Sequence, residues 1–149
     1  MIITPLESIG NLKKRMKKFN YASLYGTLIK YSSPFGVGHA YLVSYSKSSI
    51  IYNKDLKIEP LYEEISNFHT TESRTTIFQE SETIGNYTIS GEISYIYKDE
   101  LGNSDLLVVS CKDLTFYIDR QDFKTILVKT GDWVIFNITS LEFYDLEID

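Results

Sequence analysis

Cysteine, histidine and long apolar runs are scarce in this chain, and each shortage excludes a class of protein. One cysteine, Cys111, among 149 residues excludes an intramolecular disulfide scaffold. The two histidines, His39 and His69, have no second His or Cys at ligand spacing, so we predict no metal site. No apolar stretch is long enough for a membrane-spanning helix, and the N-terminus does not resemble a signal peptide. We expect a cytoplasmic protein without a membrane span or cofactor.

Catalytic motifs are missing as well. The sequence has no phosphate-binding loop, no Gly-x-Ser-x-Gly elbow and no dinucleotide fingerprint. Cys111 follows Val108, Val109 and Ser110, a setting typical of a buried, inert thiol. We therefore predict no catalytic residues and a non-enzymatic protein.

Aromatic residues, in contrast, are abundant. The chain holds twelve Tyr and eight Phe, and hydrophobic residues make up 43% of it. Tyr and Phe favour the half-buried surface of a strand, and Tyr also serves at interfaces. The composition therefore predicts a mainly β protein of one domain or two very small ones.

The sequence also repeats its own pattern. Gly26 and Gly91 are 65 residues apart. At this offset other apolar positions align, namely Leu28 with Ile93, Leu42 with Leu107, Val43 with Val108, Ile51 with Phe116 and Tyr52 with Tyr117. The pattern indicates one small β-unit built twice, or two strand-rich halves of one sheet system.

We predict three segments: an N-terminal helix in 1–20, a first β-rich half in 21–84 and a second in 85–149, which together could form one compact domain. Thr4, Pro5 and Glu7 suit the N-cap, first and third positions of a helix over 4–19. Its apolar residues recur at helical spacing, as Leu6, Ile9, Leu12, Met16 and Phe19. This basic amphipathic helix either packs on the sheet or binds a membrane surface, nucleic acid or an acidic partner.

Turn residues divide the rest into short elements. In the first half we predict strands at 21–33, 38–46 and 49–53, a short helical stripe through Leu61, Ile65 and Phe68, and an edge strand at 75–79. In the second half we predict strands at 87–97, with a bulge or bend at Gly91, and at 105–111, 114–119, 133–138 and 141–148, with a helical turn in 119–125.

The strand order of 85–149 resembles a five-stranded OB-like barrel. Residues 25–53 resemble the cold-shock proteins, because Gly36 and Gly38 follow Gly26 by ten and twelve positions, as in that family. This resemblance implies an OB-like barrel and single-stranded nucleic-acid binding. The family's stacking aromatics, however, are replaced by Val37, His39 and Ile51, which removes most of its base-stacking surface.

The charge distribution favours a protein partner. The net charge is −5, but residues 1–18 carry five basic residues and one acidic residue, so 19–149 has a balance of −9. An acidic body steers a basic partner and repels phosphate. Our leading hypothesis is a cytosolic inhibitor or immunity-type protein that covers a basic protein. Its candidate contacts are acidic residues that otherwise lie in a solvated loop: Glu59, Glu63, Glu64, Glu72, Glu80 and Glu82.

Two other functions stay open. One is a structural subunit of a larger assembly. The other is a single-stranded nucleic-acid-binding protein whose contacts are basic and tyrosine residues: Lys13, Lys14, Arg15, Lys17, Lys18, Lys30, Tyr31, Tyr41 and Tyr52.

Overall fold

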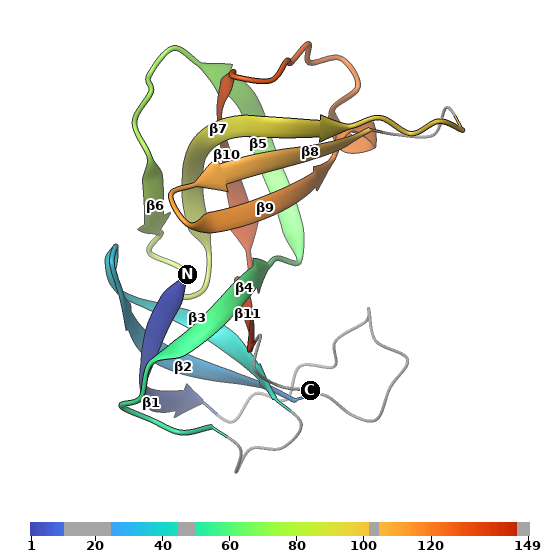
Figure 1. Ribbon diagram of the computed structural model, residues 1–149. Helices are drawn as coiled ribbons and strands as arrows, with labels where there is room; N and C mark the ends of the chain where they lie inside the picture. Colours follow the sequence, from blue (N-terminus) through green and yellow to red (C-terminus); the bar gives the residue numbers. More distant parts are fainter. Residues whose placement is uncertain (11–24, 45–49, 102–104, 146–149) are drawn as a thin grey trace.

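The chain forms a closed barrel and an open sheet (Figure 1). The computed structural model describes residues 1–10, 25–44, 50–101 and 105–145. The prediction of a mainly β fold with a small barrel is confirmed. The barrel strands follow the spatial order β1-β2-β3-β11-β4, with the bounds Ile2–Gly10 (β1), Tyr25–Ser33 (β2), Gly36–Ser44 (β3), Glu142–Asp145 (β11) and Leu56–Leu61 (β4).

The open sheet is antiparallel and has six strands. Five of them follow the order β5 (Glu64–Thr71), β10 (Trp133–Thr139), β7 (Tyr87–Tyr97), β8 (Leu106–Cys111) and β9 (Leu114–Asp119). The sixth, β6 (Ile77–Glu80), pairs with β7. A single-turn 3-10 helix, η2 (Arg120–Phe123), follows β9, which confirms the predicted helical turn.

β7 changes partner along one of its edges, while its other edge pairs with β10. Its first part pairs with β6 as far as Ser90, and its second part pairs with β8 from Glu92 onward. The strand curves between these parts (Figure 1). Gly91 lies at the change, where an added Cβ would be 2.5 Å from the Ser110 carbonyl oxygen. A side chain here would block the close approach of β8, which explains the glycine.

The N-terminal helix predicted over 4–19 is wrong in its first part, because these residues form β1; residues 11–19 lie outside the described part of the chain. Burial follows the two-residue period of a strand, with Ile3 and Pro5 buried and their neighbours more exposed. The Thr4 hydroxyl donates to Asp55 Oδ1 instead of capping a helix. Pairing with both β2 and β4 satisfies the backbone of β1, so barrel closure outweighs the local capping pattern.

The second half, 85–149, is not a barrel by itself. Its last strand, β11, leaves the open sheet and lies between β3 and β4, parallel to β3 and antiparallel to β4. In the first half, the predicted helical stripe from Leu61 to Phe68 is wrong, since these residues belong to β4 and β5. The predicted strand at 49–53 is also wrong, because the described residues 50–53 form no strand.

The sequence pattern that repeats after 65 residues does not extend to the pairing of the strands. The hairpins β2–β3 and β7–β8 lie at corresponding positions of the sequence. In the first, Leu28 is in register with Tyr41, whereas in the second Ile93 is in register with Val109, which corresponds to Ser44. The registers differ by three residues, and one unit closes while the other stays open.

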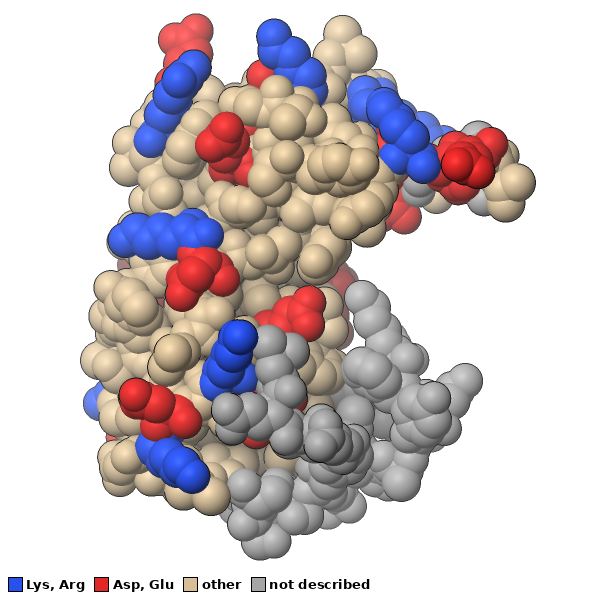
Figure 2. Space-filling view, in the orientation of Figure 1, with Lys and Arg blue, Asp and Glu red and all other residues tan. Residues whose placement is uncertain are grey.

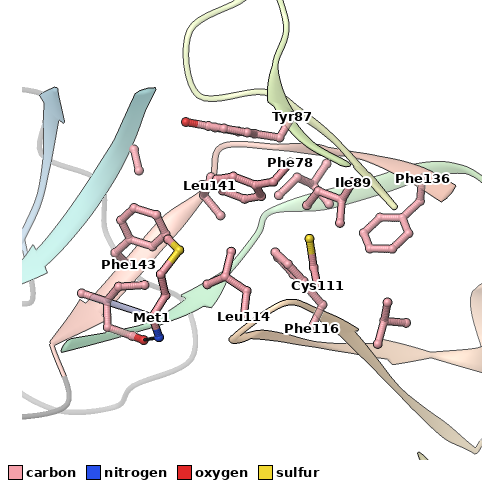
Figure 3. Packing of buried hydrophobic residues seen from close by; sticks show 14 of the residues in the cluster. Met1, Phe78, Tyr87, Ile89, Cys111, Leu114, Phe116, Phe136, Leu141 and Phe143 are labelled. Atoms are coloured by element: carbon pink, nitrogen blue, oxygen red, sulfur yellow. Dashed lines mark hydrogen bonds between the residues drawn. The ribbon is translucent and has the colours of Figure 1, made fainter. Parts of the chain in front are cut away.

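One hydrophobic cluster runs through both units (Figure 3). Phe143 of β11 and Met1 lie on the barrel side, and Phe116 and Phe136 lie inside the open sheet. The Met1 amino group donates to the carbonyl oxygens of Ile58 and Asp113, each at 3.4 Å. The two units therefore share a core as well as a chain.

Candidate functional site

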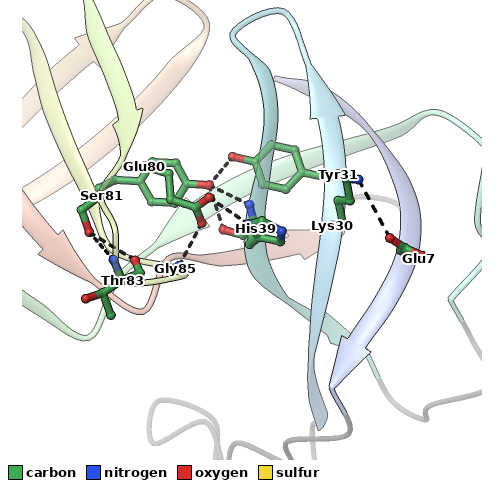
Figure 4. Close-up of polar contacts among 9 residues, drawn as sticks. Glu7, Lys30, Tyr31, His39, Glu80, Ser81, Thr83 and Gly85 are labelled. Carbon is green, nitrogen blue, oxygen red and sulfur yellow. Dashed lines mark hydrogen bonds and ion pairs between the residues drawn. The ribbon is translucent and has the colours of Figure 1, made fainter.

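Two regions stand out in the described residues: a buried polar junction between the units and an exposed tyrosine surface. The junction is built on Tyr87 of β7, whose hydroxyl lies beside Tyr31 and His39 of the barrel. Figure 4 labels Tyr31, His39 and the nearby Glu80. Its hydroxyl donates to the His39 carbonyl oxygen at 2.8 Å and accepts from the His39 N–H at 3.1 Å. The Tyr31 hydroxyl lies 2.7 Å away, and because the Tyr87 proton is already given to His39, Tyr31 is the donor. One hydroxyl thus satisfies three groups of the barrel.

The position of Tyr87 follows from the short length of β11. β11 pairs with β3 only from Tyr41 to Val43, and the Tyr41 N–H bonds to the Leu141 carbonyl oxygen. Beyond that point no described strand lies along this edge of β3, whose other edge pairs with β2. The Tyr87 hydroxyl bonds there to the backbone N–H and carbonyl groups of His39. Gly38 leaves the space for this contact, since an added Cβ would lie 2.5 Å from Tyr87 Oη.

Glu80 of β6 adds a second link across the junction. Its Oε1 lies 2.8 Å from His39 Nδ1, and its Oε2 accepts the Gly85 N–H at 2.9 Å. Burial raises the pKa of Tyr31 and of Tyr87, and the nearby Glu80 charge adds to the rise in both. Both phenols therefore keep their protons at neutral pH. The hydrogen bonds that they form across the junction hold the two units together.

The second region is the outer surface of β7, β8 and β9, which we call the tyrosine face: Tyr95, Tyr97, Leu106, Val108 and Tyr117. Tyr95 is in register with Val108, which is in register with Tyr117. The three tyrosines are 55%, 54% and 42% exposed, while Val108 between two of them is only 7% exposed. The rings of Tyr95 and Tyr97 meet edge to face, with centroids 4.6 Å apart.

A bulge in β7 presents these tyrosines. The register shifts between Ile93 and Tyr95, so Ser94 is the additional residue. Its hydroxyl donates to the Val108 carbonyl oxygen and accepts from the Ser110 hydroxyl. Because Ile93 faces the core and Ser94 faces outward, the bulge places Tyr95 and Tyr97 on the outer side.

Charged residues lie at the border of the tyrosine face. Figure 2 shows the surface over β7 to β9 as largely uncharged, with charged side chains at its margins. Lys98 Nζ and Arg120 Nη1 both lie near Asp105 Oδ2, at 3.1 and 3.7 Å. The hydrogen bond from Lys98 and the Arg120 charge hold the pKa of Asp105 below its usual value.

The acidic residues predicted as a binding site are spread over both units. Glu59 lies on β4 of the barrel. Glu64 begins β5, whereas Glu72 follows its last residue, about 25 Å away for a strand of this length. Glu80 belongs to the junction, and Glu82 is exposed in the turn after β6. Glu63 precedes β5, and its N–H donates to the Thr139 carbonyl oxygen. Only Glu63 and Glu64 are adjacent.

The described residues among those predicted for nucleic-acid binding do not form one surface either. Tyr31 is 1% exposed and belongs to the junction, so its ring cannot stack on a base. Tyr52 is half-buried and packs against the core, and Tyr41 is half-buried on β3. Lys30 is partly exposed, with its Nζ 4.0 Å from Glu7 Oε1. The basic residues from 13 to 18 lie outside the described part of the chain.

Nucleophilic and metal-binding groups are not assembled in the described residues. Cys111 is buried, its thiol donates to the Ile77 carbonyl oxygen, and burial raises its pKa to about 12. No group of three His, Cys, Asp or Glu side chains in this part of the chain is placed to hold a metal ion. None of its helices has the length and apolar character needed to cross a membrane.

The sequence reasoning missed the tyrosine face because three strands contribute to it. A signal was present: Tyr95, Tyr97 and Tyr117 alternate with apolar residues on predicted strands, which places them on the solvent side. What was missing was the pairing that brings these strands side by side.

Comparisons with family models, curated proteins and solved structures found no match to this chain.

Proposed function

We propose that the chain is a non-enzymatic binding protein that acts by contact with another protein, and that the partner is basic. The observation that carries this proposal is the tyrosine face, which has three tyrosines about half exposed and a buried valine between two of them. Tyrosine is enriched among the residues that dominate binding energy at interfaces, because its ring packs while its hydroxyl remains hydrated. The tyrosine face therefore has the composition of a contact surface.

Charge supports a basic partner. The described residues include 9 of the 15 Lys and Arg and 18 of the 20 Asp and Glu, which gives them a balance of −9. Such a body accelerates association with a basic protein and repels both nucleic acid and a second copy of itself. A protein that covers a basic partner, as an inhibitor or immunity protein does, fits this distribution.

The buried groups support a non-enzymatic role. The Cys111 thiol is buried and neutral, and His39 and Glu80 are paired across the junction. The other histidine, His69, has its Nδ1 2.8 Å from the carbonyl oxygen of Asn67 on its own strand. The thiol, both imidazoles and the Glu80 carboxylate thus already have structural contacts.

Affinity capture from the native host tests the proposal. We expect the wild-type chain to retain a basic protein that forms a complex with it again when both are purified. The double variant Tyr95→Ser/Tyr97→Ser should lose this complex. Val37→Ser is the matched control, since Val37 is 61% exposed but lies on β3 of the barrel.

Three results would overturn the proposal. Recovery of nucleic acid alone, with binding that weakens steeply as salt rises, would show the alternative function. Recovery of no partner would leave the tyrosine face without an occupant. A complex that survives the double substitution would place the contact elsewhere on the molecule.

A further inference from the structure

We propose that the Tyr95–Tyr97 pair receives an arginine or lysine side chain from an extended basic segment of the partner, an inference that rests on the proposed function. The first argument is the arrangement of the rings. They meet edge to face at 4.6 Å and are each about half exposed, so ring surface remains open to solvent. A cation held within about 6 Å of such a ring is attracted to its electron-rich face.

The chain already uses this contact within its own fold. Lys112, in the turn between β8 and β9, places its Nζ 4.8 Å from the centroid of the Phe35 ring. Phe35 in turn packs against Phe78, with ring centroids 4.9 Å apart. A cation over a ring is therefore part of the contact between barrel and sheet.

The cationic side chains beside the tyrosine face form ion pairs with a carboxylate. Lys98 and Arg120 both lie against the Asp105 carboxylate. Other carboxylates lie on the strands of the face: Glu92 of β7 is exposed, and Asp119 of β9 is in register with Leu106 of the face. The rings thus have an acidic border and no described cation of their own, which is complementary to a basic ligand and not to a phosphate backbone.

The spacing of the rings favours an extended segment. Tyr95 and Tyr97 are two residues apart on β7, so their Cα atoms are about 6.5–7 Å apart. Alternate side chains of an extended peptide have the same spacing. A second arginine or lysine, two residues along, would then lie beside the neighbouring ring or the acidic border.

Amide NMR spectra of the full chain, titrated at low salt with a short peptide of alternating arginine and glycine, test this inference. We expect saturable shifts concentrated in β7, β8 and β9. The variant Tyr95→Ser/Tyr97→Ser should weaken binding at least about fivefold, because both ring contacts are lost. Tyr95→Phe/Tyr97→Phe should retain it, since the rings remain, and Val37→Ser should leave it unchanged.

Contrary results are equally specific. No shifts, or shifts that cluster at Glu59, Glu63 and Glu64, would overturn the inference. Three other results would also overturn it. They are equal peptide binding by the Tyr95→Ser/Tyr97→Ser variant, stronger binding of an oligothymidylate than of the peptide, and occupation of the tyrosine face by a second copy of the chain in size-exclusion experiments. Capture from the host tests binding of a whole partner protein, whereas the titration tests binding of a short basic peptide. A partner that is captured although the peptide does not bind would overturn this inference and leave the proposed function standing. The failures of the two proposals are therefore distinguishable.

Discussion

The phenolic oxygens of Tyr31 and Tyr87 lie 2.7 Å apart, in a hydrogen bond that joins β2 of the barrel to β7 of the open sheet. Both side chains are buried. Tyr87→Phe would leave the Tyr31 hydroxyl and the His39 backbone groups without their partner. We expect it to lower the free energy of unfolding by about 1–3 kcal/mol, measured by urea denaturation.

A double-mutant cycle sharpens this prediction. Tyr31→Phe alone leaves Tyr87 bonded to His39, so we expect a smaller loss of about 0.5–1.5 kcal/mol. The double variant should cost about as much as Tyr87→Phe, because no phenol is then left unpaired. If the two single effects simply added, the hydroxyls would not be acting together.

Gly38→Ala should open the junction by steric conflict. The added methyl group would lie 2.5 Å from Tyr87 Oη and 2.8 Å from Tyr31 Oη. We expect a loss of about 1–3 kcal/mol in the free energy of unfolding, and a smaller loss in a Tyr87→Phe background, where the nearest oxygen is absent. Gly10→Ala is the control, because nothing lies within 4 Å of its added Cβ. Equal losses for the two alanine variants would contradict the close approach.

Substitution of Glu80 and substitution of Glu82 should have different effects on stability, although both residues belong to the same acidic stretch. Glu80→Ala removes contacts to His39 and to the Gly85 N–H, and we expect a loss of about 1–3 kcal/mol in thermal or urea unfolding. Glu82 is exposed in a turn, so Glu82→Ala should change stability by less than about 0.5 kcal/mol. Similar effects would show that Glu80 is not a structural residue.

Stability should fall in alkaline solution. Burial raises the pKa of Cys111 from 9.0 to about 12, and it also raises the pKa values of Tyr31 and Tyr87 above 10.0. Between the unfolded and folded values, the unfolded chain loses protons that the folded chain keeps. Stability is therefore complete below about pH 9 and declines as the pH rises toward and beyond 12.

Urea denaturation at a series of pH values measures this decline. Cys111→Ala should remove the part that begins near pH 9, and Tyr87→Phe should reduce the part that begins near pH 10. A free energy of unfolding that stays constant up to about pH 11 would contradict the burial of these groups.

Local patterns predicted most strands of the second half. Residues 87–97 coincide with β7, and 114–119 coincide with β9, because apolar and polar residues alternate there between clear turns. The prediction failed at residues 2–10 and 61–68, where apolar residues three or four apart imitate a helix. In both segments the decisive interactions come from strands distant in sequence, so local spacing could not reveal them.

The functional surfaces depend even more on distant pairing. Nothing near Tyr87 in the sequence indicates that its hydroxyl meets β3, 48 residues earlier. The predicted acidic site treated a run of sequence as a surface, but β5 separates its members by its whole length. Conversely, the tyrosine face unites residues of β7 and β9 only because β8 lies between them.

The place of β11 in the barrel has a consequence for synthesis of the chain. β3 and β4 are made early, but the strand between them is made after all six strands of the open sheet. Until residues 142–145 leave the ribosome, β3 and β4 expose unpaired backbone edges. The nascent protein therefore has an interval in which these edges are open to chaperones and to aggregation, and the interval lasts as long as translation of the second sheet.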